Sequence, residues 1–294
     1  MAILVLLCGL WGFQQVCVKV AVAGGLPPIA QAFVRSGGAA LLLVGWVWAR
    51  EGRRAAGRLF AVDAAFWPGL VVAAMFGIEF LFLFPGLKLT SASRGVVFLY
   101  TAPFFTALGT HSFVPAERLR LRQALGLLVA FAGVAIAFAD GITGGGGSLL
   151  GDALCAAAAV AWGATTVVVR ATPALLRAGV SRVLLFQLGG SAPLLLIGAA
   201  VSGELSAWPH ATALAWAALF YQTAVVAFAS YLVWFWLVLA YPANRLAGFT
   251  FLTPVFGILC GALILGEHIG LPILIGLIAI AAGLRLLNGA PRGR

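Results

Sequence analysis

Polar and aromatic side chains occur at helical spacing within an apolar stretch near the N-terminus. Trp11, Gln15 and Lys19 recur every four residues, so on an α-helix they lie on one face. A ring, an amide and a cation on one face suit a solute that is partly apolar, because a few placed polar groups fix its orientation. Lys19 also fits a purely structural role, in which its ammonium group reaches water beyond the helix end.

Three further charged residues, Arg35, Glu79 and Arg94, also lie within apolar stretches. A charge at the centre of a membrane-spanning helix costs about 2.5 to 3.5 kcal/mol, so such residues usually face a protein interior, a partner or water. Glu79 is the only acid in the middle of such a stretch, and we expect it to pair with Lys19, Arg35 or Arg94. A fixed structural pair, a site for the charged groups of a zwitterion and a site for a coupled proton remain alternatives.

Other candidate binding residues lie further along the chain. Trp162 and Thr166 are four residues apart on a later apolar stretch, and Tyr100 and Gln187 are polar groups in the middle of two others. Tyr231 lies among several aromatic residues that could stack on an aromatic or cationic solute, although packing against lipid produces the same composition. The candidate substrate-binding residues are Trp11, Gln15, Tyr100, Trp162, Thr166, Gln187 and Tyr231.

Membrane-spanning helices are the elements that must position these residues. The chain of 294 residues is 63% hydrophobic and 9% charged, whereas about a quarter of a soluble domain is charged. An apolar helix of about 20 residues crosses a bilayer core and satisfies its own backbone hydrogen bonds there. We therefore predict an all-α integral membrane protein with ten transmembrane helices: Ala2–Val22, Ile29–Trp48, Ala64–Phe84, Ala92–His111, Gln123–Ala139, Leu149–Val169, Val183–Val201, Ala211–Leu239, Ala243–Leu265 and Leu271–Leu287.

Basic residues are distributed unevenly among the connections. Of the 18 Lys and Arg residues, 14 lie in even-numbered connections or at the C-terminal end, and only Lys88 and Arg94 lie in odd-numbered ones. Because cytoplasmic loops carry the excess of Lys and Arg, both termini are predicted to be cytoplasmic. This distribution also accounts for the net charge of +10. The sequence contains no basic run interleaved with aromatic residues, so we do not expect a nucleic-acid partner.

The chain contains an internal duplication. We predict a first repeat over 1–139, a glycine-rich linker over 140–148 and a second repeat over 149–288. Five helices per copy is an odd number, so the second copy must enter the membrane from the opposite side, as in many secondary transporters. The matching pairs at an offset of 151 are Trp11-Gly12 with Trp162-Gly163, Lys19 with Arg170, Arg94 with Arg245 and Pro103 with Pro254; those at an offset of 150 are Glu117 with Glu267, Gly126 with Gly276 and Gly133 with Gly283.

Pro103 and Pro254 are expected in the middle of the fourth and ninth helices. Proline has no N–H to donate, so it loosens a helix and can form a hinge or a kink. Because both copies keep the proline, we favour a role in gating over simple packing.

Metal and acid–base chemistry have little support in this sequence. The four cysteines lie in apolar stretches without CxxC spacing, which is typical of small buried side chains. Eight acidic residues and three histidines are scattered and form no cluster of the kind an enzyme site needs. We therefore expect no enzyme activity, no metal and no other cofactor.

Taken together, these residues resemble the EamA family of the drug/metabolite transporter superfamily over almost the whole chain. Within that family the sequence is most similar to bacterial exporters of aromatic amino acids. Glu79 and the Gln14-Gln15 pair depart from the general family pattern. The resemblance rests on Trp11-Gly12 with Lys19, Pro27-Pro28 with Arg35 and Ala39, Thr90-Ser91-Ala92, Thr101-Ala102-Pro103, Glu117-Arg118-Leu119, Gly126, Ala132-Gly133-Val134, Trp162-Gly163, Thr253-Pro254-Val255, Gly266-Glu267 and Gly283.

The resemblance implies a transporter of two EamA repeats in the bacterial inner membrane. Such a protein exports small metabolites, here aromatic amino acids, by alternating access through a central cavity. Its partners would be the small-molecule substrate and the lipid bilayer, and we expect a monomer while the oligomeric state stays open. The alternatives are an exporter of drugs or other organic cations and, from another class, a structural or partner-binding membrane protein.

Overall fold

The computed structural model describes residues 2–115, 119–142, 148–206, 211–240 and 252–288. Every regular element in these ranges is a helix, which confirms the all-α prediction. The first half contains α1 (Ala2–Ala23), α2 (Pro28–Glu51), α3 (Arg53–Arg58), α4 (Phe66–Leu89), α5 (Ala92–Leu99), α6 (Ala102–Phe113) and α7 (Leu121–Ile142). The second contains α8 (Leu149–Ala171), α9 (Pro173–Arg177), α10 (Val180–Val201), η2 (Glu204–Ser206), α11 (Ala213–Phe220), η4 (Tyr221–Ser230), α12 (Tyr231–Ala240), α14 (Leu252–Leu265) and α15 (Leu271–Asn288).

Length and composition identify membrane-spanning helices within the described ranges. Six stretches qualify there, namely Ala2–Ala23, Pro28–Glu51, Phe66–Leu89, Leu149–Ala171, Val180–Val201 and Ala213–Trp234. Three shorter apolar stretches accompany them, namely Leu121–Gly133, Leu252–Leu265 and Leu271–Gly283. The chain is therefore a multi-pass membrane protein, and the number ten stays a prediction.

The fourth predicted helix is interrupted close to Pro103, the residue at which the sequence allowed a hinge or a kink. It forms α5 and α6, which are separated at Tyr100 and Thr101. Pro103 is the second residue of α6, and in a continuous helix its ring would clash with the carbonyl of Leu99. Pro254 is the third residue of α14, and 241–251 lie outside the described residues. The hinge role of both prolines stays a prediction.

The eighth predicted helix is also irregular. It begins as α11, continues as the π-helix η4 over ten residues and ends as α12. Ten residues is long for a π-helix, because π turns in proteins mostly occur singly. Such turns often lie at functional sites. Gln222 of η4 lies inside the bundle and donates from Nε2 to Oε1 of Gln31 on α2 at 3.0 Å.

Equivalent glycines of the two repeats make equivalent close contacts. A Cβ on Gly12 of α1 would lie 2.7 Å from Cβ of Phe256 on α14. A Cβ on Gly163 of α8 would lie 2.7 Å from Cβ of Phe105 on α6. Both the glycines and the phenylalanines are separated by 151 residues. The offset in the sequence is therefore reproduced in the packing.

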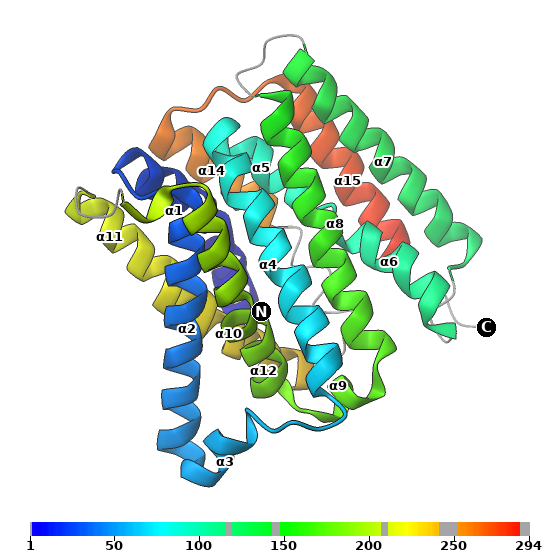
Figure 1. The fold of residues 1–294 in the computed structure, drawn as a ribbon. Coiled ribbons are helices and arrows are strands. Elements are labelled where there is room, and N and C mark those ends of the chain that lie inside the picture. Colours follow the sequence, from blue (N-terminus) through cyan, green and yellow to red (C-terminus); the bar gives the residue numbers. More distant parts are fainter. Residues whose placement is uncertain (1, 116–118, 143–147, 207–210, 241–251, 289–294) are drawn as a thin grey trace.

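The two helices that end the repeats, α7 and α15, lie side by side at one edge of the bundle (Figure 1). They run antiparallel, because Gly133 approaches Gly276 and Ile280 while Gly283 approaches Gly126 and Ala130. The helices α2 and α10 are also antiparallel, since Gly198 contacts Ile29 and Gly189 contacts Ala40. This packing is the one expected for two copies related by a two-fold axis perpendicular to the helices.

Carboxylates of the second repeat cap two helices of the first. Glu204 Oε2 accepts hydrogen bonds from the backbone N–H groups of Ile29, at 2.7 Å, and Ala30, at 2.9 Å. Glu267 accepts from the N–H groups of Ala92, at 2.6 Å, and Ser93, at 2.9 Å. An anion at a helix N-terminus satisfies free N–H groups and interacts favourably with the helix dipole. The starts of α2 and α5 are therefore held by distant parts of the chain.

We predict that Gly12→Ala lowers the free energy of unfolding by about 1–3 kcal/mol, the usual range for overpacking a core. The added methyl would lie 2.6 Å from the backbone nitrogen of Gly257, which cannot rotate away. Gly9→Ala on the same helix is the matched control, because a Cβ at Gly9 meets nothing within 4 Å. Equilibrium unfolding in mixed detergent micelles measures both variants, and equal stability of the two would contradict the close packing of α1 on α14.

Candidate functional site

Arg35 on α2 is fully buried in the helix bundle. Its Nη2 donates to the hydroxyl of Tyr231 on α12 at 3.0 Å. Its guanidinium carbon lies 4.4 Å from the centroid of the Phe80 ring on α4, a stacking geometry that arginine favours. Nε and Nη1 are buried without a hydrogen-bond partner among the described residues. A permanent cation thus has donors that no described acceptor satisfies.

Glu79 precedes Phe80 on α4 and lies close enough to Arg35 for their charges to interact. Only 5% of Glu79 is exposed, and its Oε2 has no hydrogen-bond partner within the described part of the chain. Of the three cations predicted as its partner, Lys19 and Arg94 instead bind other groups. Arg35 and Glu79 are therefore neighbours inside the bundle, and each has buried polar atoms without a hydrogen-bond partner among the described residues.

Aromatic side chains surround this pair. Tyr100, at the break between α5 and α6, lies within electrostatic range of Glu79 and Tyr231. The Tyr100 and Trp162 rings meet edge to face with their centroids 5.7 Å apart. We call Arg35, Glu79, Phe80, Tyr100 and Tyr231 the Arg35 cluster. It brings together four residues predicted from the sequence, on three predicted helices of the first repeat and one of the second.

The remaining predicted binding residues have other surroundings. Trp11 Nε1 donates to Ser230 Oγ of η4 at 2.8 Å. Gln15 is buried, and its Oε1 has no hydrogen-bond partner among the residues described. Thr166 donates to the carbonyl of Trp162 in its own helix at 3.2 Å, and Gln187 is partly buried on α10. Their role in binding stays a prediction.

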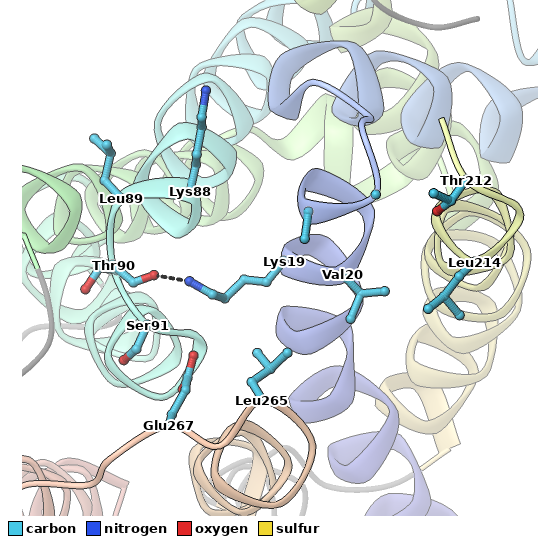
Figure 2. A pocket seen from close by; sticks show the side chains of 12 residues that line it. Lys19, Val20, Lys88, Leu89, Thr90, Ser91, Thr212, Leu214, Leu265 and Glu267 are labelled. Atoms are coloured by element: carbon cyan, nitrogen blue, oxygen red, sulfur yellow. Dashed lines mark hydrogen bonds between the residues drawn. The ribbon is translucent and has the colours of Figure 1, made fainter. Parts of the chain in front are cut away.

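Lys19 lines an open pocket of about 670 Å³ at one end of the bundle (Figure 2). Its ammonium group donates to the carbonyl of Thr90 at 2.5 Å and to that of Leu87 at 3.2 Å, where α4 ends. A cation at a helix C-terminus interacts favourably with the helix dipole. Glu267 lies across the same pocket, which does not contain the Arg35 cluster.

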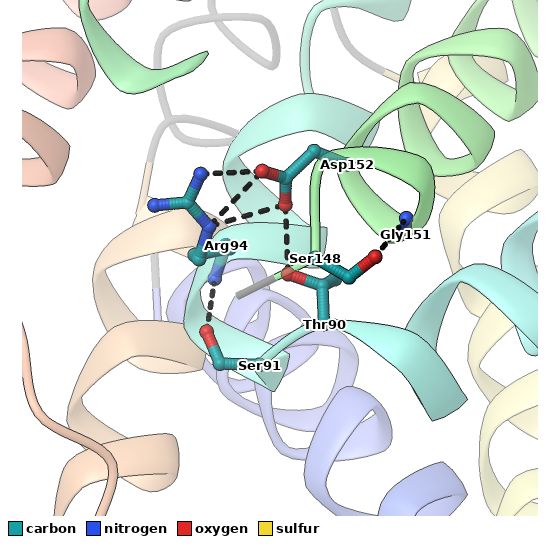
Figure 3. Close-up of polar contacts among 6 residues, drawn as sticks. All are labelled: Thr90, Ser91, Arg94, Ser148, Gly151 and Asp152. Atoms are coloured by element: carbon teal, nitrogen blue, oxygen red, sulfur yellow. Dashed lines mark hydrogen bonds and ion pairs between the residues drawn. The ribbon is translucent and has the colours of Figure 1, made fainter. Parts of the chain in front are cut away.

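Arg94 is part of a buried polar network rather than of the Arg35 cluster (Figure 3). Its Nε donates to Asp152 Oδ1 of α8 at 3.1 Å, and its Nη2 also contacts Oδ2. Thr90 Oγ1 donates to the same carboxylate at 2.7 Å. Arg94 is 2% and Asp152 0% exposed, so this ion pair ties α5 to α8 inside the protein.

Sequence reasoning missed Asp152 and Phe80. Asp152 lies in the first turn of α8, where an acid is common because of the helix dipole, so its type and position carried no signal of a buried pair. Phe80 is one of 21 phenylalanines and is distinguished only by its contact with Arg35. The adjacency of Glu79 and Phe80 is visible in the sequence, but the position of Arg35 over the Phe80 ring and near Glu79 depends on the packing of α2 against α4.

The model of the EamA-like transporter family matches residues 1–139 and 149–289. The chain belongs to the EamA-like transporter family. This EamA-like chain is also 30% identical to a Bacillus subtilis (strain 168) protein named as the uncharacterized transporter YvbV, over 226 residues that cover 76% of this chain and 72% of that protein.

A solved crystal structure has the same fold as this EamA-like protein. The likeness has a TM-score of 0.67 and covers 97% of this chain and 96% of that one, at 21% identity. Family membership points to a membrane transporter of small substrates rather than to an enzyme or a purely structural protein. Among the described residues, no three His, Cys, Asp or Glu side chains are grouped to hold a metal ion.

Proposed function

We propose that this EamA-like transporter exports small amphipathic metabolites and that aromatic amino acids are its substrates. The observation that carries the proposal is the buried Arg35, with two nitrogens that have no hydrogen-bond partner among the described residues, beside the buried Glu79 and the rings of Phe80 and Tyr231. A substrate carboxylate would accept charge-assisted hydrogen bonds from Arg35, and a substrate ammonium group would bind Glu79. Phe80, Tyr100 and Tyr231 would contact the aromatic side chain.

Charge distinguishes this proposal from its main alternative, export of drugs or other organic cations. A cation without a carboxylate would bind Glu79 but would leave the guanidinium of Arg35 buried and unpaired, which is unfavourable. A zwitterion provides one partner for each charge. The Arg35 cluster therefore favours amino acids over organic cations.

Alternating access is the transport mechanism that fits the two repeats. The antiparallel packing of α7 on α15 and of α2 on α10 supports inverted repeats, whose relative rocking would expose a central site to each side in turn. We infer that both termini lie in the cytoplasm of a bacterial cell, because Lys and Arg are concentrated in the even-numbered connections and at the C-terminal end. The proposed repeats are 1–139 and 149–288; α7 continues to Ile142, and 143–147 of the proposed linker lie outside the described residues.

Counterflow of labelled phenylalanine and tryptophan into proteoliposomes tests the proposal. We expect saturable exchange with the protein and none in protein-free vesicles. A pH gradient applied to wild type and Glu79→Gln shows whether Glu79 also carries a coupled proton, in which case the variant loses the response to the gradient. If folded, inserted wild-type protein matches empty vesicles for both amino acids while it exchanges a labelled organic cation, the alternative substrate class is correct.

A further inference from the structure

A second pocket, of about 470 Å³, lies at the opposite, arginine-rich end of the molecule. Its walls come from the connection between α3 and α4 and from the segment of α9 and the start of α10. Arg58, Arg177 and Arg182 line it together with Asp63. The pocket thus joins the two repeats at the end predicted to face the cytoplasm.

Arg182 is the fixed part of this pocket. It is 8% exposed and donates from Nη1 to Asp63 Oδ2 at 2.6 Å and from Nη2 to Asp63 Oδ1 at 2.9 Å. Nη2 also donates to the carbonyl of Ala61 at 2.5 Å. Its Nε is buried and has no hydrogen-bond partner among the described residues. Arg182 is thus a fixed positive charge in the wall of the pocket, and both of its Nη groups already donate to Asp63 and Ala61.

The pocket keeps an excess of positive charge. Arg182 donates to Asp63 and lowers the pKa of that carboxyl, and the amide of Ala65 lowers it further, so Asp63 is ionised at neutral pH. Asp63 is the only acid among the described residues that line the pocket. It compensates one arginine, and the exposed Arg58 and Arg177 leave a net charge of about +2 there.

The surroundings of the pocket are apolar and exposed. Phe60, Val62 and Trp67, from the connection and the start of α4, are 61%, 76% and 72% exposed, and Leu176 of α9 is 60% exposed. In a membrane protein such side chains contact lipid, and tryptophan favours the level of the headgroups. We therefore expect the arginines to lie at the level of the lipid phosphates.

We propose that this pocket binds a phosphate group, which an anionic phospholipid headgroup supplies. The exposed Arg58 and Arg177 suit a phosphate because each guanidinium can donate two parallel hydrogen bonds to its oxygens, and the fixed charge of Arg182 lies beside them. Basic pockets between helices on the cytoplasmic side bind anionic headgroups in this way. A free phosphate ion has the same chemistry, and the two sources differ in whether acyl chains contact the exposed apolar residues.

Binding of phosphatidylglycerol to the full-length protein in phosphatidylcholine nanodiscs tests this proposal, with thermal unfolding as the readout. Phosphatidylglycerol should raise the unfolding temperature of wild type. In the double variant Arg58→Gln/Arg177→Gln its apparent affinity should fall by about fivefold or more, because two charge-assisted contacts are lost at a partly screened site. Arg53→Gln/Arg54→Gln is the matched control, since it removes two exposed arginines of α3 that do not line the pocket.

Inorganic phosphate, added without phosphatidylglycerol, is the second arm. If it raises the unfolding temperature of wild type as much as the lipid does, and only the pocket variant loses that effect, the site binds free phosphate. If the control variant weakens lipid binding as much as the pocket variant, attraction is a property of the whole basic surface and the proposal is overturned. The absence of any effect of either anion on wild type also overturns it.

Discussion

Asp152→Asn is expected to lower the free energy of unfolding by about 3–5 kcal/mol, the range for removing one partner of a buried ion pair. Arg94 and Asp152 are 2% and 0% exposed, so water cannot replace the lost carboxylate. The neutral amide takes the charge of the Asp152 carboxylate away from the buried Arg94 cation, and Thr90 loses a charged acceptor. Unfolding by sodium dodecyl sulfate in mixed micelles gives the free energy directly.

Two further variants separate the charge from the packing. Arg94→Leu/Asp152→Leu removes both charges, and it should recover most of the lost stability because hydrophobic replacement of a buried pair is often neutral. Thr90→Val removes only the hydroxyl donor and should cost about 1 kcal/mol. Wild-type stability of the Asp152→Asn variant would mean that α5 and α8 are held by apolar contacts alone.

Arg35→Gln is expected to raise the KM for phenylalanine counterflow by about tenfold or more. A hydrogen bond to a charged group contributes about 1.5–3 kcal/mol, and each 1.4 kcal/mol is a factor of ten in affinity. Arg35→Lys keeps the charge but not the planar fork, so it should lie between wild type and Arg35→Gln. Competition by unlabelled ligands in the same assay measures the loss.

The carboxylate contact has its own control. Phenethylamine has the ring and the ammonium group of phenylalanine but no carboxylate, so the proposed site binds it through Glu79 and the aromatic rings. Its competition should be strengthened by Arg35→Gln, because the variant removes the guanidinium that this ligand leaves unpaired, and weakened by Glu79→Gln. An equal loss for both ligands in Arg35→Gln would place Arg35 in the structure of the site rather than in contact with the carboxylate.

The helical class and the duplication were predictable because they depend on composition and on spacing along the chain. Gly12 and Gly163 stand at the same offset in the sequence and in the packing, since a repeated contact keeps the residues that form it. Pro103 allowed a hinge or a kink in the fourth helix, but neither the exact place of the break at Tyr100 nor the π-helix at Tyr221–Ser230 was predicted. Both are changes of backbone hydrogen bonding over one or two turns, and neighbouring helices decide them as much as local sequence does.

The partners of buried charges were the hardest feature to predict. Glu79, Lys19, Arg35 and Arg94 were all recognised as unusual from their types alone. Which cation would lie near Glu79 could not be read from spacing, because the four residues lie on α4, α1, α2 and α5. The crossing of these helices decides it, and it places Arg35 beside Glu79 while Arg94 reaches Asp152.

The two glutamates that cap α2 and α5 also determine when the first repeat can be complete. Glu204 and Glu267 each follow the N–H group that they cap by 175 residues. A ribosome that synthesises the chain from its N-terminus therefore translates α1 to α10 before either cap, and Asp152 follows Arg94 by 58 residues. The starts of α2 and α5 therefore lack these two carboxylate caps until the second half of the chain has been synthesised.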